Sequence, residues 1–123
     1  MVILNVDDDL DDRDMFRQAL MAIDSNISCV LIESVEEALE WIEHADVLPD
    51  YIFLDINMPR MNGYECVDAI HSMTGTDGIQ IVMYSTTFNP KRQEELERLG
   101  IRHLLKTSRV ADLQQSIKDL ICV

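Results

Sequence analysis

Six polar residues of this sequence follow directly on short apolar segments: Asp7 and Asp8, Asp55, Ser85 and Thr86, and Lys106. Three carboxylates brought together repel one another and raise each other's pKa values unless a cation joins them. Carboxylate oxygens suit Mg²⁺, which uses few protein carboxylates and keeps several waters. A carboxylate beside such a cation can attack a phosphoryl group, whose oxygens the metal, a lysine and a hydroxyl then stabilise. These residue types predict a magnesium-assisted aspartyl phosphate, provided that the fold brings them together.

The segments that carry these residues predict an α/β fold of alternating strands and helices. Residues 51–54 (Tyr-Ile-Phe-Leu) are large and apolar, which indicates a strand buried on both faces and ending at Asp55. Apolar strands that alternate with amphipathic helices predict a parallel sheet covered on both faces. Because parallel strands all end at one edge, the six polar residues are expected to meet in one crevice. The expected strands cover residues 2–6, 27–32, 51–54, 79–84 and 101–105.

Helix signals lie between the strands. Ser34-Val35-Glu36-Glu37 is a capping box that opens the second helix. Asn89-Pro90 supplies an N-cap and a first-turn proline for the fourth helix, and Ser108 is the expected cap of the last one. The fourth helix, residues 91–99, is unusually polar, so we expect it to be held loosely and to be a moving part.

The composition predicts one globular domain over residues 1–123, with no output domain. A formal net charge of −13 repels phosphate backbones, which argues against direct nucleic-acid binding. No apolar run is long enough to cross a membrane. Cys29, Cys66 and Cys122 lack metal-type spacing and are interpreted as reduced thiols of a cytoplasmic protein.

The acidic run continues beyond Asp7 and Asp8 into the first helix. Its further members are interpreted as a capping residue followed by charges that complement the helix dipole. These residues are Asp9, Asp11, Asp12 and Asp14.

Four motifs at strand ends resemble those of the receiver domain of bacterial two-component response regulators, most closely the stand-alone chemotaxis type. They are Val6-Asp7-Asp8, Leu54-Asp55-Ile56-Asn57-Met58-Pro59 with Met61 and Gly63, Met83-Tyr84-Ser85-Thr86, and Leu104-Leu105-Lys106. The resemblance covers essentially the whole chain. It implies a doubly wound, flavodoxin-like (βα)5 fold with strand order 2-1-3-4-5. It also implies a phosphorelay function with no enzymatic activity beyond self-phosphorylation and autodephosphorylation.

The resemblance implies a role for each matching acidic residue. Asp55 would accept the phosphoryl group. Asp8, Asp55 and the backbone carbonyl of Asn57 would bind Mg²⁺, and Asp7 would act through a metal-bound water.

The resemblance likewise implies which residues would contact the phosphoryl group. Ser85, with Thr86 beside it, would be the switch hydroxyl, and Lys106 would pair with a phosphoryl oxygen. The side chains of Asn57 and Thr87 would tune the rate of hydrolysis.

Two positions depart from the family pattern. The family usually has Lys-Pro with a cis peptide bond where this chain has Lys106-Thr107, so this bond is either trans or held cis at a high cost. Some stand-alone receivers associated with phytochrome-type kinases resemble this chain in having Ser or Thr there. His103 stands where the family has a rotating Tyr or Phe. It is interpreted either as a strand residue that faces solvent or as a switch that titrates near neutral pH.

The implied partners are a sensor histidine kinase or phosphotransfer protein and a downstream protein target. The target would bind the face formed by the fourth helix, the fifth strand and the fifth helix, and the protein would be a monomer or a phosphorylation-dependent dimer. One alternative is a constitutive protein-binding pseudo-receiver, although all the principal site positions are filled. Another is a haloacid-dehalogenase-type magnesium phosphatase, but the stretch 7–11 lacks the Thr or Val that ends that motif.

Overall fold

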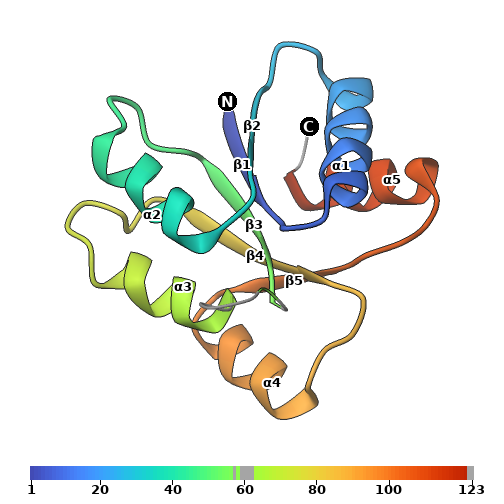
Figure 1. Ribbon diagram of the computed structural model, residues 1–123. Helices are drawn as coiled ribbons and strands as arrows, with labels where there is room; N and C mark the ends of the chain where they lie inside the picture. Colours follow the sequence, from blue (N-terminus) through green and yellow to red (C-terminus); the bar gives the residue numbers. More distant parts are fainter. Residues whose placement is uncertain (57, 59–62, 122–123) are drawn as a thin grey trace.

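A computed structural model of the protein describes residues 1–56, 58 and 63–121. Five parallel strands form one sheet in the order β2-β1-β3-β4-β5, and helices cover both of its faces (Figure 1). This confirms the predicted doubly wound, flavodoxin-like fold. The strands are β1 (Val2–Val6), β2 (Ser28–Ile32), β3 (Tyr51–Asp55), β4 (Gln80–Ser85) and β5 (Arg102–Leu105). The helices are α1 (Leu10–Ile23), α2 (Val35–His44), α3 (Gly63–His71), α4 (Pro90–Arg98) and α5 (Val110–Ile121).

The central strand β3 separates two apolar cores. All five of its residues are buried, and neighbouring side chains point to opposite faces of the sheet. Tyr51 and Phe53 pack with α1 and α5, whereas Ile52 and Leu54 pack with α2, α3 and α4. A strand buried on both faces has no polar side chain until its last residue, Asp55. The core therefore ends where the polar edge of the sheet begins.

Helix starts follow the predicted capping signals, with one exception. The Ser34 hydroxyl accepts the Glu37 N–H at 3.2 Å, and the Asn89 side chain accepts the Lys91 N–H at 3.0 Å. The prediction that Ser108 caps α5 was wrong. The helix begins at Val110, because the Leu113 N–H bonds to the Arg109 carbonyl and Arg109 is thus the residue before the helix.

The polar helix α4 buries only Leu96 among its residues. Its outer surface carries i,i+3 and i,i+4 ion pairs, such as Arg98 with Glu94 at 2.9 Å. Exposed pairs of this kind contribute little stability. A helix anchored by one apolar side chain fits the expectation of a moving part, and that expectation stays a prediction. No helix in the ranges that the structure covers combines the length and apolar character of a membrane span.

The carboxyl ends of the strands lie together at one edge of the sheet (Figure 1). Asp7 follows β1 and its N–H bonds to the Ile32 carbonyl at 3.0 Å, while the Lys106 N–H bonds to the Ser85 carbonyl at 2.7 Å. These bonds continue the parallel pairing one residue beyond the strands. They fix the backbone from which the predicted site residues project.

Candidate functional site

Lys106 is the centre of the polar edge. Its ammonium nitrogen lies 2.7 Å from Asp7 Oδ2, 2.9 Å from Asp12 Oδ2 and 3.2 Å from Asp55 Oδ2. The Lys106 side chain is only 10% exposed, and its nitrogen sits 5.2 Å from the centre of the Tyr84 ring. Ion pairs that are shielded from water in this way are screened far less than surface pairs. The structure thus brings three carboxylates, from the residue after β1, the first turn of α1 and the end of β3, around the lysine that follows β5.

Asp7, Asp8 and Asp55 form a cluster of carboxylates. One oxygen from each lies within 4.8 Å of the others, with Asp7 and Asp55 buried and Asp8 exposed. Oxygen donors on two buried groups and one open to solvent fit Mg²⁺, which binds a few carboxylates and keeps its other positions for water. The sequence prediction that these three residues meet is confirmed by their positions. Asn57, the expected backbone ligand, lies outside the described residues.

Burial decides the protonation of the cluster. Withdrawal from water raises the pKa of Asp7 to about 6, although bonds to Lys106 and to the Asp9 N–H oppose the rise. For Lys106, burial alone would lower the pKa, but hydrogen bonds to Asp7 and Asp12 and the charge of Asp55 raise it above its usual value. Lys106 therefore stays charged, and an added cation would favour the ionised form of Asp7.

The start of α1 holds Asp7 in place. The Arg13 guanidinium donates to the Asp7 carbonyl at 2.7 Å, and the Asp9 N–H donates to Asp7 Oδ1 at 3.0 Å. Asp9 in turn accepts the Asp12 N–H at 3.0 Å as the N-cap of α1. The expectation of a capping residue in the acidic run is confirmed for Asp9. The same turn of helix sets the direction of both Asp7 and Asp12.

The hydroxyl residues after β4 differ in exposure. Ser85 is the last residue of β4 and is buried, whereas Thr86 and Thr87 are exposed. The backbone of Ser85 is tied to that of Lys106, which keeps β4 and β5 in register at the site. All three hydroxyls thus stand at the edge that carries the carboxylates, with Ser85 deepest.

The structure describes both positions at which the chain departs from the family pattern. No peptide bond between described residues is cis, so the Lys106–Thr107 bond is trans. The interpretation of His103 as a solvent-facing residue was wrong. Its ring is partly buried and meets the Phe88 ring edge to face, with 4.8 Å between ring centres. Burial lowers the pKa of His103, so the neutral ring is favoured.

Sequence reasoning missed the contact between Asp12 and Lys106. Asp12 was interpreted only as a dipole-complementing charge, in the same class as Asp11. Both residues lie in the first turn of α1, but only Asp12 turns toward the sheet edge. No spacing rule separates the two, because the choice depends on how α1 is rotated against β1 and β5.

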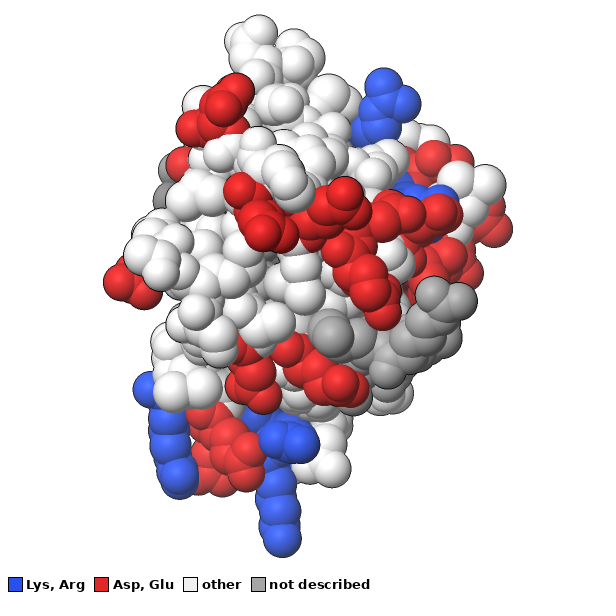
Figure 2. Space-filling model, turned by 60° about the vertical axis from the view of Figure 1, so that its left-hand side comes forward, with Lys and Arg blue, Asp and Glu red and all other residues white. Residues whose placement is uncertain are grey.

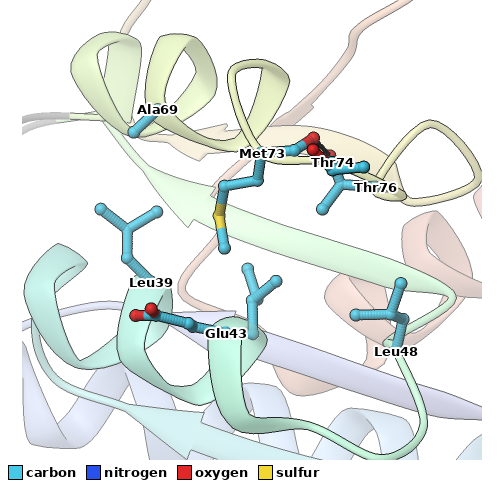
Figure 3. Close-up of a pocket in the computed structure, with 8 residues that line it drawn as sticks. Leu39, Glu43, Leu48, Ala69, Met73, Thr74 and Thr76 are labelled. Carbon is cyan, nitrogen blue, oxygen red and sulfur yellow. Dashed lines mark hydrogen bonds between the residues drawn. The ribbon is translucent and has the colours of Figure 1, made fainter.

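An apolar groove lies away from this edge. A groove of about 500 Å³ between α2 and α3 is lined by Leu39, Leu48 and Met73, with Glu43 at its rim (Figure 3). It adjoins the segments that lead into β3 and β4, away from the carboxylate cluster. Seen from the side of α2 and α3, groups of acidic side chains are spread across a mostly uncharged surface, and basic side chains lie toward its lower and upper right edges (Figure 2). The groove is thus separate from the carboxylate cluster.

Comparison with known proteins decides the family. Residues 3–118 match the response regulator receiver domain. The chain belongs to the receiver domains of two-component response regulators. Receivers of this family bind Mg²⁺ at an acidic pocket, are typically phosphorylated, and interact with histidine kinases and downstream targets.

Relatives of this receiver occur inside longer proteins. It is 35% identical over 65 residues to the sensor histidine kinase CheAY of Helicobacter pylori, which is 51% of this chain and 8% of that protein. It is 27% identical over 117 residues to protein-glutamate methylesterase/protein-glutamine glutaminase 1 of Methanosarcina acetivorans, which is 91% of this chain and 33% of that protein. The receiver therefore spans a minor part of these two relatives.

Solved structures of similar proteins share the fold. The receiver superimposes on Vibrio cholerae chemotaxis protein CheY4 with a TM-score of 0.79 and 27% identity, covering 96% of both chains. The phosphorylated cyanobacterial phytochrome response regulator RcpA gives a TM-score of 0.84 at 24% identity, covering 97% of this chain and 89% of that one. At 24% identity, the similarity to RcpA shows a shared fold alone.

Proposed function

We propose that this receiver accepts a phosphoryl group on Asp55 from a phosphohistidine of a sensor histidine kinase or phosphotransfer protein. The observation that carries the proposal is the position of Asp55, which ends a buried strand, contacts Lys106 and lies within the cluster of Asp7 and Asp8. In the reaction, a carboxylate oxygen of Asp55 forms a bond to phosphorus as the N–P bond breaks. The imidazole leaves with the electrons of that bond and takes up a proton.

The chain's own residues would divide the work of binding and orientation. Asp8 and Asp55, together with the backbone carbonyl of Asn57, would hold Mg²⁺, and Asp7 would orient a metal-bound water. The metal would supply positive charge to the oxygens of the phosphoryl group. Asp7 is pre-set for this task because Arg13 and the Asp9 N–H fix it on both sides.

The groups on β4 and β5 would stabilise the product. Lys106 would pair with a phosphoryl oxygen, and the hydroxyl of Ser85, with Thr86 beside it, would donate a hydrogen bond to another. Asn57 and Thr87 would set how readily water attacks the aspartyl phosphate. Turnover would be confined to self-phosphorylation and autodephosphorylation.

The output of the receiver would be a protein contact, with residues 1–123 acting as a single unit in the cytoplasm. The contact face would include α4, β5 and α5, as a monomer or as a phosphorylation-dependent dimer. His103 and Phe88 would take part, because their ring contact links β5 to the loop after β4. Any movement of that loop toward a phosphoryl group would disturb this contact. The family and the filled site favour a receiver over the phosphatase alternative.

Mass spectrometry after incubation with acetyl phosphate tests the proposal. A Mg²⁺-dependent gain of about 80 Da, one phosphoryl group, is expected in the wild type and in Asp77→Asn, an exposed control, and not in Asp55→Asn. Beryllofluoride binding covers the case of rapid hydrolysis. A protein that shows neither an adduct nor Mg²⁺-dependent beryllofluoride binding would contradict the proposal and favour the pseudo-receiver.

A further inference from the structure

Among the described residues of the site, Asp12 contacts Lys106. Its Oδ2 lies 2.9 Å from the Lys106 nitrogen, and its side chain is 33% exposed. The carboxylates that can share a metal are Asp7, Asp8 and Asp55, and Asp12 is not among them. A cation bound to these three residues would therefore neutralise part of their charge, whereas the negative charge of Asp12 would still be balanced by Lys106.

The ammonium of Lys106 has three N–H groups and three carboxylate partners within 3.2 Å. An oxyanion on Asp55 would take over the contact that Asp55 makes with Lys106, and would share the ammonium with Asp7 and Asp12. The backbone N–H of Asp12 is bonded to Asp9 in the first turn of α1, which fixes the point from which its side chain reaches Lys106. The negative charge of Asp12 thus competes with the oxyanion for the same cation.

We propose that the negative charge of Asp12 partly neutralises the Lys106 ammonium and thereby weakens the binding of an oxyanion at Asp55. The inference rests on the proposed function and names a regulator of that same site. Asp12 acts through Lys106 and does not itself touch the phosphoryl group. Its charge shortens the life of the phosphorylated state, because Lys106 is already neutralised in part when the phosphoryl group arrives.

Two substitutions separate this effect from its opposite, in which Asp12 merely anchors Lys106. Asp12→Asn keeps an oxygen acceptor and removes the charge, whereas Asp12→Glu keeps the charge. Asp11→Asn is the matched control. It removes one charge from the same turn of α1, so the helix dipole changes equally, but Asp11 is exposed and lies outside the Lys106 contacts.

Beryllofluoride, a phosphoryl mimic, is titrated in excess Mg²⁺ and followed by ¹⁹F NMR. We expect Asp12→Asn to bind it about tenfold more tightly than the wild type, and Asp11→Asn to stay within about twofold. Asp12→Asn should also hydrolyse its ³²P-labelled aspartyl phosphate more slowly, and Asp12→Glu should behave as the wild type. Affinity for Asp12→Asn that is weaker, or equal to that of Asp11→Asn, would overturn the inference.

A measurement without metal tests the contact itself. The ¹⁵N resonance of the Lys106 ammonium should shift in Asp12→Asn and stay in place in Asp11→Asn, and equal spectra would overturn the inference. Failure of the proposed function looks different. If the wild type binds no beryllofluoride, the receiver chemistry itself is refuted. If it binds but Asp12→Asn and Asp11→Asn agree, only the role of Asp12 is refuted.

Discussion

The Lys106 ammonium lies 2.7 Å from a carboxylate of Asp7 that is completely buried. The two residues come from opposite ends of the chain, after β1 and β5. Because β3 and β4 lie between those strands in the sheet, the ion pair bridges the carboxyl edge of the sheet. Their pairing explains how three acidic groups can share the edge of the sheet before any metal binds. It also makes the stability of the fold depend on the charge state of the site.

Replacing Lys106 by Met should destabilise the protein by about 3 kcal/mol, because it leaves a buried carboxylate without its cation. Urea denaturation measures the change in the free energy of unfolding. Lys118→Met on the exposed side of α5 is the control and should change little. Mg²⁺ should restore part of the loss in Lys106→Met, since a ligand that binds only the folded state stabilises it. Equal unfolding midpoints for the two variants would show that the Lys106 contacts contribute nothing net.

Asp7→Asn should stabilise the protein at pH 7.5 more than at pH 4. The folded-state pKa of Asp7 is raised from 3.8 to about 6. Its protonated form therefore adds stability below pH 3.8, and this is lost as the pH rises through about 6. Asn mimics the protonated form at every pH, so the gain over wild type should approach but not exceed about 3 kcal/mol at neutral pH.

Thermal or urea unfolding of the wild type and Asp7→Asn across this pH range checks the prediction. Asp14→Asn removes a charge from an exposed position of α1 and serves as the comparison. A gain for Asp7→Asn that is the same at pH 4 and pH 7.5 would mean that burial does not disfavour the ionised form of Asp7.

His103→Phe should reduce the amount by which the free energy of unfolding falls when the pH is lowered. Burial lowers the folded-state pKa of His103 from 6.5, while the charge of Glu97 acts weakly in the opposite sense. The neutral ring thus adds stability above pH 6.5 that is lost as the pH falls through the lower folded value. Phe keeps the ring contact with Phe88 and cannot be protonated.

The measurement compares unfolding free energies between pH 7.5 and 5. His71→Phe, at an exposed position of α3, controls for the loss of a histidine. The difference between His103→Phe and wild type should grow as the pH falls. A constant difference would indicate that the His103 ring accepts a proton as readily in the folded protein as in the unfolded one.

Gly63→Ala should disturb the site, because the added methyl group would press against the backbone of Asp55. A Cβ at position 63 would lie 2.8 Å from the Asp55 carbonyl oxygen and 2.8 Å from the Met83 side chain. The Gly63 N–H also bonds to the Ile56 carbonyl, so the helix start cannot easily move away. We expect a loss of about 1–3 kcal/mol, as for other overpacked sites, and weaker Mg²⁺ binding.

Gly78→Ala is the matched control for this substitution. A Cβ there meets no atom within 4 Å, and its backbone is not in the left-handed region. It should be neutral, or stabilising by a few tenths of a kcal/mol through the unfolded state. Circular dichroism melts and Mg²⁺ titration of both variants test the comparison, and similar behaviour would show that the close approach to Asp55 relaxes without cost.

The sequence by itself determined the strands and the edge of the sheet at which the polar residues lie. Apolar segments mark the strands to within a residue, most clearly for β3, where burial on both faces excludes charged side chains up to Asp55. Asp7, Asp55 and Lys106 could then be brought together from sequence, since every parallel strand ends at the same edge. Local capping signals such as Ser34 and Asn89 also depend only on nearby backbone N–H groups.

Only the tertiary structure decided which side chains beyond the strand ends make contacts at or near the site. Asp11 and Asp12 are equivalent in sequence, and the rotation of α1 against the sheet selects Asp12 for Lys106. The contact of His103 with Phe88 likewise depends on where the loop after β4 crosses β5. Strand ends follow from local burial, whereas these contacts join segments far apart in the chain, and their geometry is set by how helices and loops pack on the completed sheet.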